Sequence, residues 1–226
     1  METLLGARIK LDATDGEALV LTYKALLKQS ILCRARARMT TDISDEDIEH
    51  ALTKYIDHIY KWLDSTDFFM CPASTRYHDS HPSGLLHHSL NVYNQVTDLI
   101  KLPQFKGKVG IASATLVTLT HDWCKIGRYE TYYRNVKNPD TGAWESVPGY
   151  KTAQSNLGRL GHGVQSLTMV MQVCTHPWMS LTFEEMAAIR WHMGVYQVTD
   201  TERDDLFRCN DMVPLVSLIL IMPMLK

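Results

Sequence analysis

The sequence lacks the features that define several classes of protein. Its five cysteines are odd in number and widely spaced, and no two are separated by only two residues. This spacing argues against a disulfide framework and a zinc ribbon, and it predicts a reducing, cytoplasmic environment. We expect the cysteines to be small core residues, and only Cys124 lies near other candidate metal ligands in the sequence.

The chain also has no charge excess and no membrane-spanning run. Its 23 Lys and Arg and 25 Asp and Glu give a formal net charge of −2, which provides no basic footprint for nucleic acid. One basic cluster, Arg34, Arg36 and Arg38, is expected to be a solvated helix C-terminus. The N-terminus is not expected to be a signal peptide. The apolar stretch 213–225 is too short to cross a bilayer, and we predict a buried helix ending at or near Pro223.

Helical patterns dominate what is present. The 226 residues, 45% of them hydrophobic, suffice for one sizeable core. Apolar side chains recur at helical spacing, Ser44 followed by three acidic residues predicts an N-cap, and Thr182 with Glu185 forms a capping-box pattern. The predicted helices cover 15–39, the segment from Ser44 to about Leu63, 85–99, 109–123, 163–173 and 182–192.

One segment departs from the helical pattern. Within 135–156, the string Asn138-Pro139-Asp140-Thr141-Gly142 is a strong turn signal between short β-like pieces. No internal repeat or low-complexity linker is present. The sequence therefore predicts an all-α bundle with a small β-hairpin insertion. The insertion gathers aromatic residues that could stack on a nucleobase or equally pack into a core: Tyr129, Tyr132, Tyr133, Trp144 and Tyr150.

A His-Asp pair, His121 and Asp122, follows an apolar run that ends at Leu119. Three more histidines, His88, His162 and His192, fall at predicted helix ends or first turns beside glycines, where a backbone approaches a ligand closely. A single histidine of this kind would be interpreted as a hydrogen-bonded structural residue. Four ordered positions around a His-Asp pair instead favour one metal site inside a helical bundle.

These motifs together resemble the HD-domain metal-dependent phosphohydrolases, and more closely the small stand-alone HD-domain proteins of bacteria and phages. The resemblance covers roughly 67–225, so that 67–226 is expected to be the HD domain and 1–66 to be N-terminal helices packing on its core. The matching strings are Asp67-Phe68-Phe69, Pro72-Ala73-Ser74-Thr75-Arg76-Tyr77-His78, Gly84-Leu85-Leu86-His87-His88-Ser89-Leu90, His121-Asp122-Trp123-Cys124-Lys125, Asn135-Val136-Lys137-Asn138, Gly161-His162-Gly163 and Ala188-Ile189-Arg190-Trp191-His192-Met193-Gly194.

The resemblance implies a divalent-metal phosphohydrolase acting on a nucleotide or other small phosphate ester. The expected cofactor is one or two ions of manganese, iron, zinc, nickel or magnesium. The implied ligands are His88, His121, Asp122, His162 and His192, with Asp122 bridging two ions and acting as a catalytic residue. Lys125 is expected to be a second catalytic residue and to face the substrate phosphate, the alternative being a surface lysine. Arg76 and His78, on the loop entering the first motif, are further candidates for substrate binding.

Two departures from the family pattern leave alternatives open. Pro223 stands where the family has a final Asp ligand, and a proline offers no ligand and ends a helix. Asp211 is the nearest upstream carboxylate, and Val164 replaces an acidic residue usual after the Gly-His-Gly string. The alternatives are a nuclease that trims single strands, which the acidic composition disfavours, and a degenerate HD protein that binds a nucleotide or partner without catalysis. A membrane is not expected as a partner. A nucleic acid is possible but is not favoured.

Overall fold

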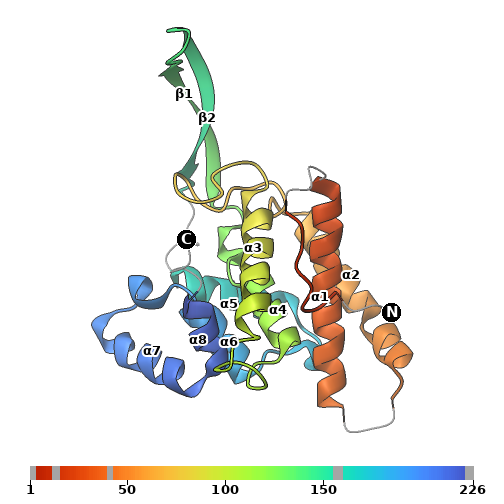
Figure 1. The fold of residues 1–226 in the computed structure, drawn as a ribbon. Helices are drawn as coiled ribbons and strands as arrows, with labels where there is room; N and C mark the ends of the chain where they lie inside the picture. The colour runs from red at the N-terminus through yellow and green to blue at the C-terminus, as the bar shows by residue number, and fades with distance from the viewer. Residues whose placement is uncertain (1–3, 12–15, 40–42, 155–159, 222–226) are drawn as a thin grey trace.

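The computed structural model describes residues 4–11, 16–39, 43–154 and 160–221. Within these ranges the protein is a bundle of α-helices with one two-stranded sheet (Figure 1). The helices are α1 (Gly16–Arg38), α2 (Asp45–Asp64), α3 (Gly84–Leu99), α4 (Ile111–Thr120), α5 (His162–Val173), α6 (Phe183–Trp191), α7 (Asp200–Met212) and α8 (Pro214–Ile221). The 3₁₀ turns in the described ranges are η1 (Trp123–Lys125), η3 (Pro177–Met179) and η4 (Gly194–Gln197).

Helix α4 lies at the centre of the bundle. It packs against α1, α3 and α6, and every side chain from Ala114 to Thr120 is buried. A helix that is apolar on all sides must be covered on all sides, which is why this short run is enclosed by other helices. The consequence is that the chain leaving α4, at His121, is already inside the protein.

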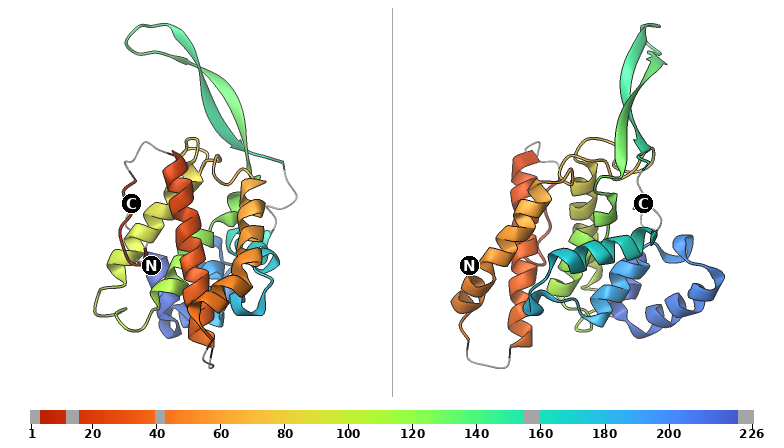
Figure 2. Two further views of the ribbon diagram at one scale, coloured as in Figure 1. Left: turned by 90° about the vertical axis from the view of Figure 1, so that its right-hand side faces the viewer. Right: turned by 180° about the vertical axis from the view of Figure 1, so that it is seen from behind.

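The sheet is a β-hairpin that projects from one end of the helical body (Figure 2). Strand β1 (Tyr129–Lys137) pairs antiparallel with β2 (Trp144–Thr152), and Tyr132 lies opposite Gly149. The hairpin starts next to η1 and returns with the amide of Ala153 donating to the Arg128 carbonyl. Its root is therefore attached to the segment that carries the His-Asp pair.

Most predicted elements are confirmed, and the exceptions have local reasons. The Ser44 cap and the Thr182–Glu185 capping box form as predicted, and the strands extend well beyond the predicted turn. Helix α7 was not predicted. Leu206 is its one buried residue, so the helix gives almost no apolar pattern in the sequence. A second capping box, formed by Thr199 and Glu202, was the sequence signal for it.

Two predictions about single residues are wrong. Arg34 is buried, because its guanidinium group donates to both carboxylate oxygens of Glu185 across the bundle, whereas its neighbour Arg36 is exposed as predicted. Cys33 is exposed rather than a core residue, since it lies on the outer face of α1, while Cys71, Cys124 and Cys174 are buried. Among the described residues, no helix is long and apolar enough to cross a membrane.

Candidate metal centre

The end of α4 holds the His-Asp pair in a fixed position. The Tyr23 hydroxyl donates to the Leu119 carbonyl, and the indole N–H of Trp123 donates to the Tyr23 hydroxyl. On the other side, the amide of Cys124 donates to the hydroxyl of Ser166 in α5. These bonds flank the pair on both sides, so His121 and Asp122 are placed by α1, α4 and α5 together.

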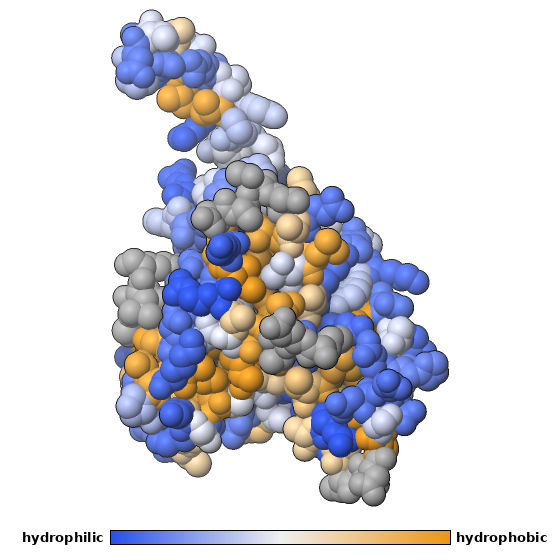
Figure 3. All heavy atoms as spheres, turned by 45° about the vertical axis from the view of Figure 1, so that its right-hand side comes forward, coloured by the Kyte–Doolittle hydropathy of each residue, from blue (hydrophilic) through white to orange (hydrophobic). Residues whose placement is uncertain are grey.

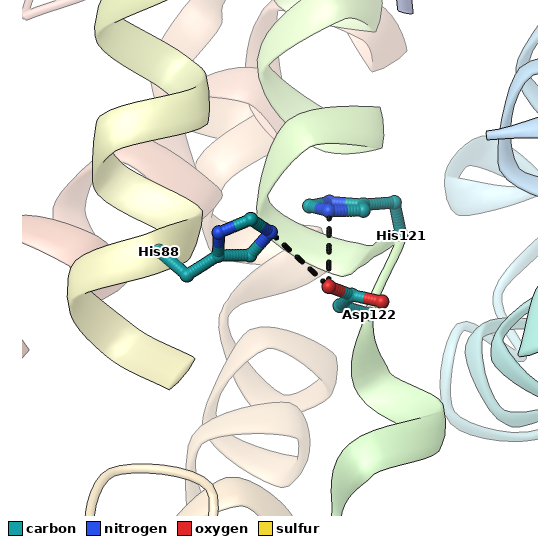
Figure 4. Close-up of side chains that lie close together, drawn as sticks. All are labelled: His88, His121 and Asp122. Atoms are coloured by element: carbon teal, nitrogen blue, oxygen red, sulfur yellow. Dashed lines mark ion pairs between the residues drawn. The ribbon is translucent and has the colours of Figure 1, made fainter. Parts of the chain in front are cut away.

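Three imidazoles converge on the Asp122 carboxylate from three separate segments. Figure 4 shows two of them, those of His88 and His121. The Nε2 atoms of His88, from α3, and of His121 lie 3.2 Å and 3.3 Å from Asp122 Oδ2. The Nε2 atom of His192, just after α6, lies 3.4 Å from Asp122 Oδ1. All four side chains are at least 90% buried. The structure therefore brings together four of the five predicted ligands.

In His121 and His192, the partner of Nδ1 determines whether Nε2 carries a proton or a lone pair. Nδ1 of His121 lies 2.8 Å from the Thr118 carbonyl, and Nδ1 of His192 lies 2.8 Å from the Ile189 carbonyl. Because a carbonyl only accepts, each Nδ1 carries the proton, and in the neutral ring Nε2 presents a lone pair. Backbone carbonyls orient metal-binding histidines in the same way.

Lone pairs facing a carboxylate repel it unless a cation lies between them. Burial lowers the pKa of His121 to about 4, so this ring is neutral at pH 7. Within the described residues, neither His192 Nε2 nor Asp122 Oδ1 has a hydrogen-bond partner, although such buried atoms almost always have one. The donor set, three imidazoles and a carboxylate, fits a divalent transition metal.

Asp79 adds an outer carboxylate that the sequence did not reveal. Its Oδ2 atom lies 3.6 Å from His88 Nδ1, and the interaction with His88 lowers the pKa of Asp79. A carboxylate behind a ligating imidazole fixes the ring and increases its basicity. Gly84 makes this contact possible, because a Cβ atom there would lie 1.9 Å from the Asp79 carbonyl oxygen. The loop can therefore lie directly on the first turn of α3.

A second set of donors lies on the other side of Asp122. Ligand atoms of Asp122, Cys124 and His162 all fall within 4.8 Å of one another. His162 begins α5, which packs closely on α6 because Gly163 has no side chain; a Cβ there would lie 1.9 Å from the Arg190 carbonyl oxygen. Burial raises the pKa of the Cys124 thiol to about 12 and lowers that of His162 to about 4. These residues could also hold a metal ion, and Asp122 belongs to both sets.

Lys125 is the cation nearest to the centre. Its Nζ lies 2.7 Å from Asp122 Oδ2, and its side chain is buried rather than on the surface. Burial opposes ionisation of Asp122, but the adjacent Lys125 ammonium group outweighs it and holds the pKa of Asp122 well below its usual range. Asp122 in turn keeps the pKa of Lys125 raised despite burial. The predicted phosphate contact of Lys125 stays a prediction, since the structure pairs it with Asp122.

The remaining predicted site residues lie at the edge of the centre. The ring of His78 is 4.8 Å from that of His88, whereas Arg76 is exposed. Arg128, which the sequence analysis did not single out, lies close enough to contribute to the lowered pKa of His162. No ion pair of Arg128 is found in the described part of the chain. Its position three residues after Lys125 was the available signal for it.

The positions that depart from the family pattern are only partly described. Pro223 lies outside the described residues. Asp211 is exposed and belongs to α7 rather than to α8. The two helices are separate because Pro214 begins a new one.

Comparison with known proteins adds no assignment. No protein-family model, curated protein or solved structure matches the chain.

Proposed function

We propose that the protein is a divalent-metal-dependent phosphohydrolase of the HD-domain type that acts on a nucleotide or another phosphate ester. The observation that carries the proposal is the convergence of three buried Nε2 atoms on Asp122, with the Nδ1 atoms of His121 and His192 committed to backbone carbonyls. A structural histidine cluster would pair its donors with acceptors. Here acceptors face acceptors, which favours a cation between them.

His88, His121 and Asp122 would hold the primary ion, with His192 on the other carboxylate oxygen. Cys124 and His162 offer donors for a second ion that shares Asp122. When bound, such an ion supplies a Lewis acid for a phosphoryl oxygen and makes water a stronger acid. Asp79 would keep the His88 ring oriented, as the carbonyls of Thr118 and Ile189 do for His121 and His192.

The cations around the centre match an anionic substrate. Lys125 neutralises Asp122 in the metal-free protein, and a bound ion would take over that role. Its ammonium group could then face a substrate phosphate. Arg128, whose charge contributes to the lowered pKa of His162, is a second group of the right charge. Buried or half-buried cations strengthen hydrogen bonds to phosphate.

The proposal is tested by measuring metal content and hydrolysis on the same purified protein. We expect at least one manganese, iron, zinc or nickel ion per chain and metal-dependent release of phosphate from a panel of nucleotides. Asp122→Asn should lose most of the metal and at least about 100-fold in rate, since it removes both a charge and a ligand. Asp205→Asn, at an exposed position of α7, is the matched control and should behave as wild type.

The second alternative, a degenerate protein that binds without catalysis, gives a different result. A degenerate binding protein would contain metal and bind nucleotide without turnover, and Asp122→Asn would change binding only. An empty site in metal-replete wild type would contradict the proposal altogether.

A further inference from the structure

A hollow lies where the hairpin meets the loop before α3. It has a volume of about 470 Å³, which is the size of a small-ligand site. A second hollow of about 460 Å³ shares four lining residues with it. We call the two together the arm cleft. Its principal lining residues are Thr75, Arg76 and Tyr77 of the loop and Tyr132, Arg134, Tyr150 and Lys151 of the hairpin.

The arm cleft carries positive charge without matching negative charge. Arg76 and Arg134 both line it, and neither forms an ion pair with any residue that the structure describes. Lys151 is paired with Glu130 at 3.3 Å, outside the lining. No carboxylate is among the lining residues. Since both guanidinium groups line the same hollow, an anion bound there would accept hydrogen bonds from them.

The cleft also presents aromatic rings to solvent. Tyr77 is 85% exposed, and Tyr132 and Tyr150 are half-buried. The ring of Tyr132 lies against Gly149 in the opposite strand, where a Cβ would lie 3.0 Å from its Cζ atom. The hairpin therefore fixes this ring in place. A partly exposed tyrosine held in place beside arginines is suited to stack on a nucleobase and to leave the arginines for the adjoining phosphate.

The loop and the hairpin both connect the arm cleft to the metal centre. Arg76 and Tyr77 directly precede His78, whose ring contacts that of His88. The Tyr129 hydroxyl, at the root of the hairpin, donates to the Ala73 carbonyl at 3.3 Å. Tyr129 begins β1 four residues after Lys125, the last residue of η1, which places the root of the hairpin beside the centre. A ligand extending from the centre along Tyr129 would enter the cleft.

We propose that the arm cleft binds one nucleotide unit of a single-stranded oligonucleotide, with its base on the tyrosines and its phosphate between Arg76 and Arg134. This inference rests on the proposed function only in assigning the neighbouring phosphate to the metal centre. The arginines of the cleft are separate from Lys125 and Arg128, so the ligand carries at least two phosphates. That requirement selects an oligonucleotide over a mononucleotide with a single phosphate.

The overall charge of −2 is compatible with this ligand. A duplex-binding protein neutralises many phosphates and needs a broad basic face. The arm cleft would contact one or two phosphates and gain the rest of its affinity from stacking. Figure 3 shows the hairpin standing clear of the body with hydrophilic and hydrophobic side chains mixed on its surface, as such a contact requires.

The test is fluorescence anisotropy with a fluorescein-labelled deoxyadenosine hexamer and the full chain, both wild type and Asp122→Asn. We expect the hexamer to bind both proteins and unlabelled AMP to compete at least tenfold more weakly than unlabelled hexamer. Arg76→Ala combined with Arg134→Ala should weaken binding at least tenfold, and Tyr132→Ala at least fivefold. The slope of log affinity against log salt should be about −1.4, as expected for two phosphates.

Lys137→Ala on the outer hairpin and Tyr196→Ala on η4 are matched controls and should bind as wild type. Arg134→Glu is a second variant that should also weaken hexamer binding. Since position 134 is exposed, this variant is expected to fold. Equal affinity for hexamer and AMP, or unchanged binding by the arginine and tyrosine variants, would overturn the inference. Because hydrolysis is not the readout, a chain that cleaves phosphate esters but fails these tests loses only this inference. A chain that passes them without hydrolysing anything loses only the proposed function.

Discussion

The protein buries two carboxylates, and the contrast between them separates structure from chemistry. Glu185 is fully buried, and both of its oxygens accept from Arg34 while one also accepts from the Thr182 amide. Asp122 is buried to a similar extent, but its Oδ1 atom has no hydrogen-bond partner in the described residues and faces His192 Nε2. One carboxylate is satisfied by the protein alone, and the other is not.

The difference follows from what surrounds each carboxylate. Arg34 supplies a planar fork of N–H donors, which matches a carboxylate in charge and shape. Around Asp122, Lys125 is the only group among its described neighbours with a permanent positive charge, and the imidazoles add lone pairs. An arrangement that leaves buried acceptors unmatched costs free energy. It is therefore expected where an external cation completes it.

The largest expected effect comes from breaking the satisfied pair. Glu185→Gln leaves the Arg34 charge buried without a counter-ion, and we expect the free energy of unfolding to fall by about 3–5 kcal/mol. Urea denaturation measures it. Glu184→Gln, at the exposed neighbouring position of the same helix, is the matched control and should change stability by less than about 0.5 kcal/mol. A loss from Glu185→Gln no larger than that of the control would show that the pair is not structural.

The same pair should make the protein sensitive to acid. Arg34 outweighs the effect of burial and holds the pKa of Glu185 below its ordinary value of 4.5. Because the pKa of Glu185 is lower in the folded state than in the unfolded state, the pair stabilises the fold fully at pH values above the unfolded-state pKa. This stabilisation is lost as the pH falls through the folded-state pKa. Stability that falls below about pH 4.5 in wild type should fall less steeply in Glu185→Gln.

The second effect concerns the unsatisfied carboxylate. If a cation completes the Asp122 centre, manganese at 100 times its dissociation constant should add about 2.7 kcal/mol to the free energy of unfolding. The added stability should vanish in Asp122→Asn and persist in Glu184→Gln. Thermal unfolding with and without manganese measures this gain. Stabilisation that persists in Asp122→Asn would place the ion elsewhere and remove the contrast between the two carboxylates.

The sequence predicted the elements better than it predicted these partners. Caps at Ser44 and Thr182 depend on residues three positions away, so they are readable locally. The Arg34–Glu185 pair joins residues 151 positions apart, and a basic residue near a helix end looks the same whether it is solvated or paired. Tertiary packing alone decides between these outcomes.

The candidate site shows the same division. The His-Asp pair and the three ordered histidines were evident from their types and order, and the structure brings all of them to Asp122. Asp79 and Arg128 were not evident from the sequence. Their proximity to His88 and His162 arises from the folding of distant segments, which their sequence neighbours do not reveal. Their roles, like the ligand roles of the histidines, stay predictions.

The smallest expected effect tests whether Asp79 belongs to the centre or only to the loop. Asp79→Asn keeps the size of the side chain and suits the left-handed backbone there, where φ is 48°. We expect metal affinity to fall about 10–100-fold, as for other carboxylates behind a ligating histidine, with less than about 0.5 kcal/mol change in metal-free stability. Competition with a chelating dye measures the affinity. Asp98→Asn, which removes the partner of the exposed Arg8, is the control and should leave metal affinity unchanged. Equal metal affinity in Asp79→Asn and wild type would mean that the His88 ring is held by packing alone, and Asp79 would then be a loop residue without a part in the centre.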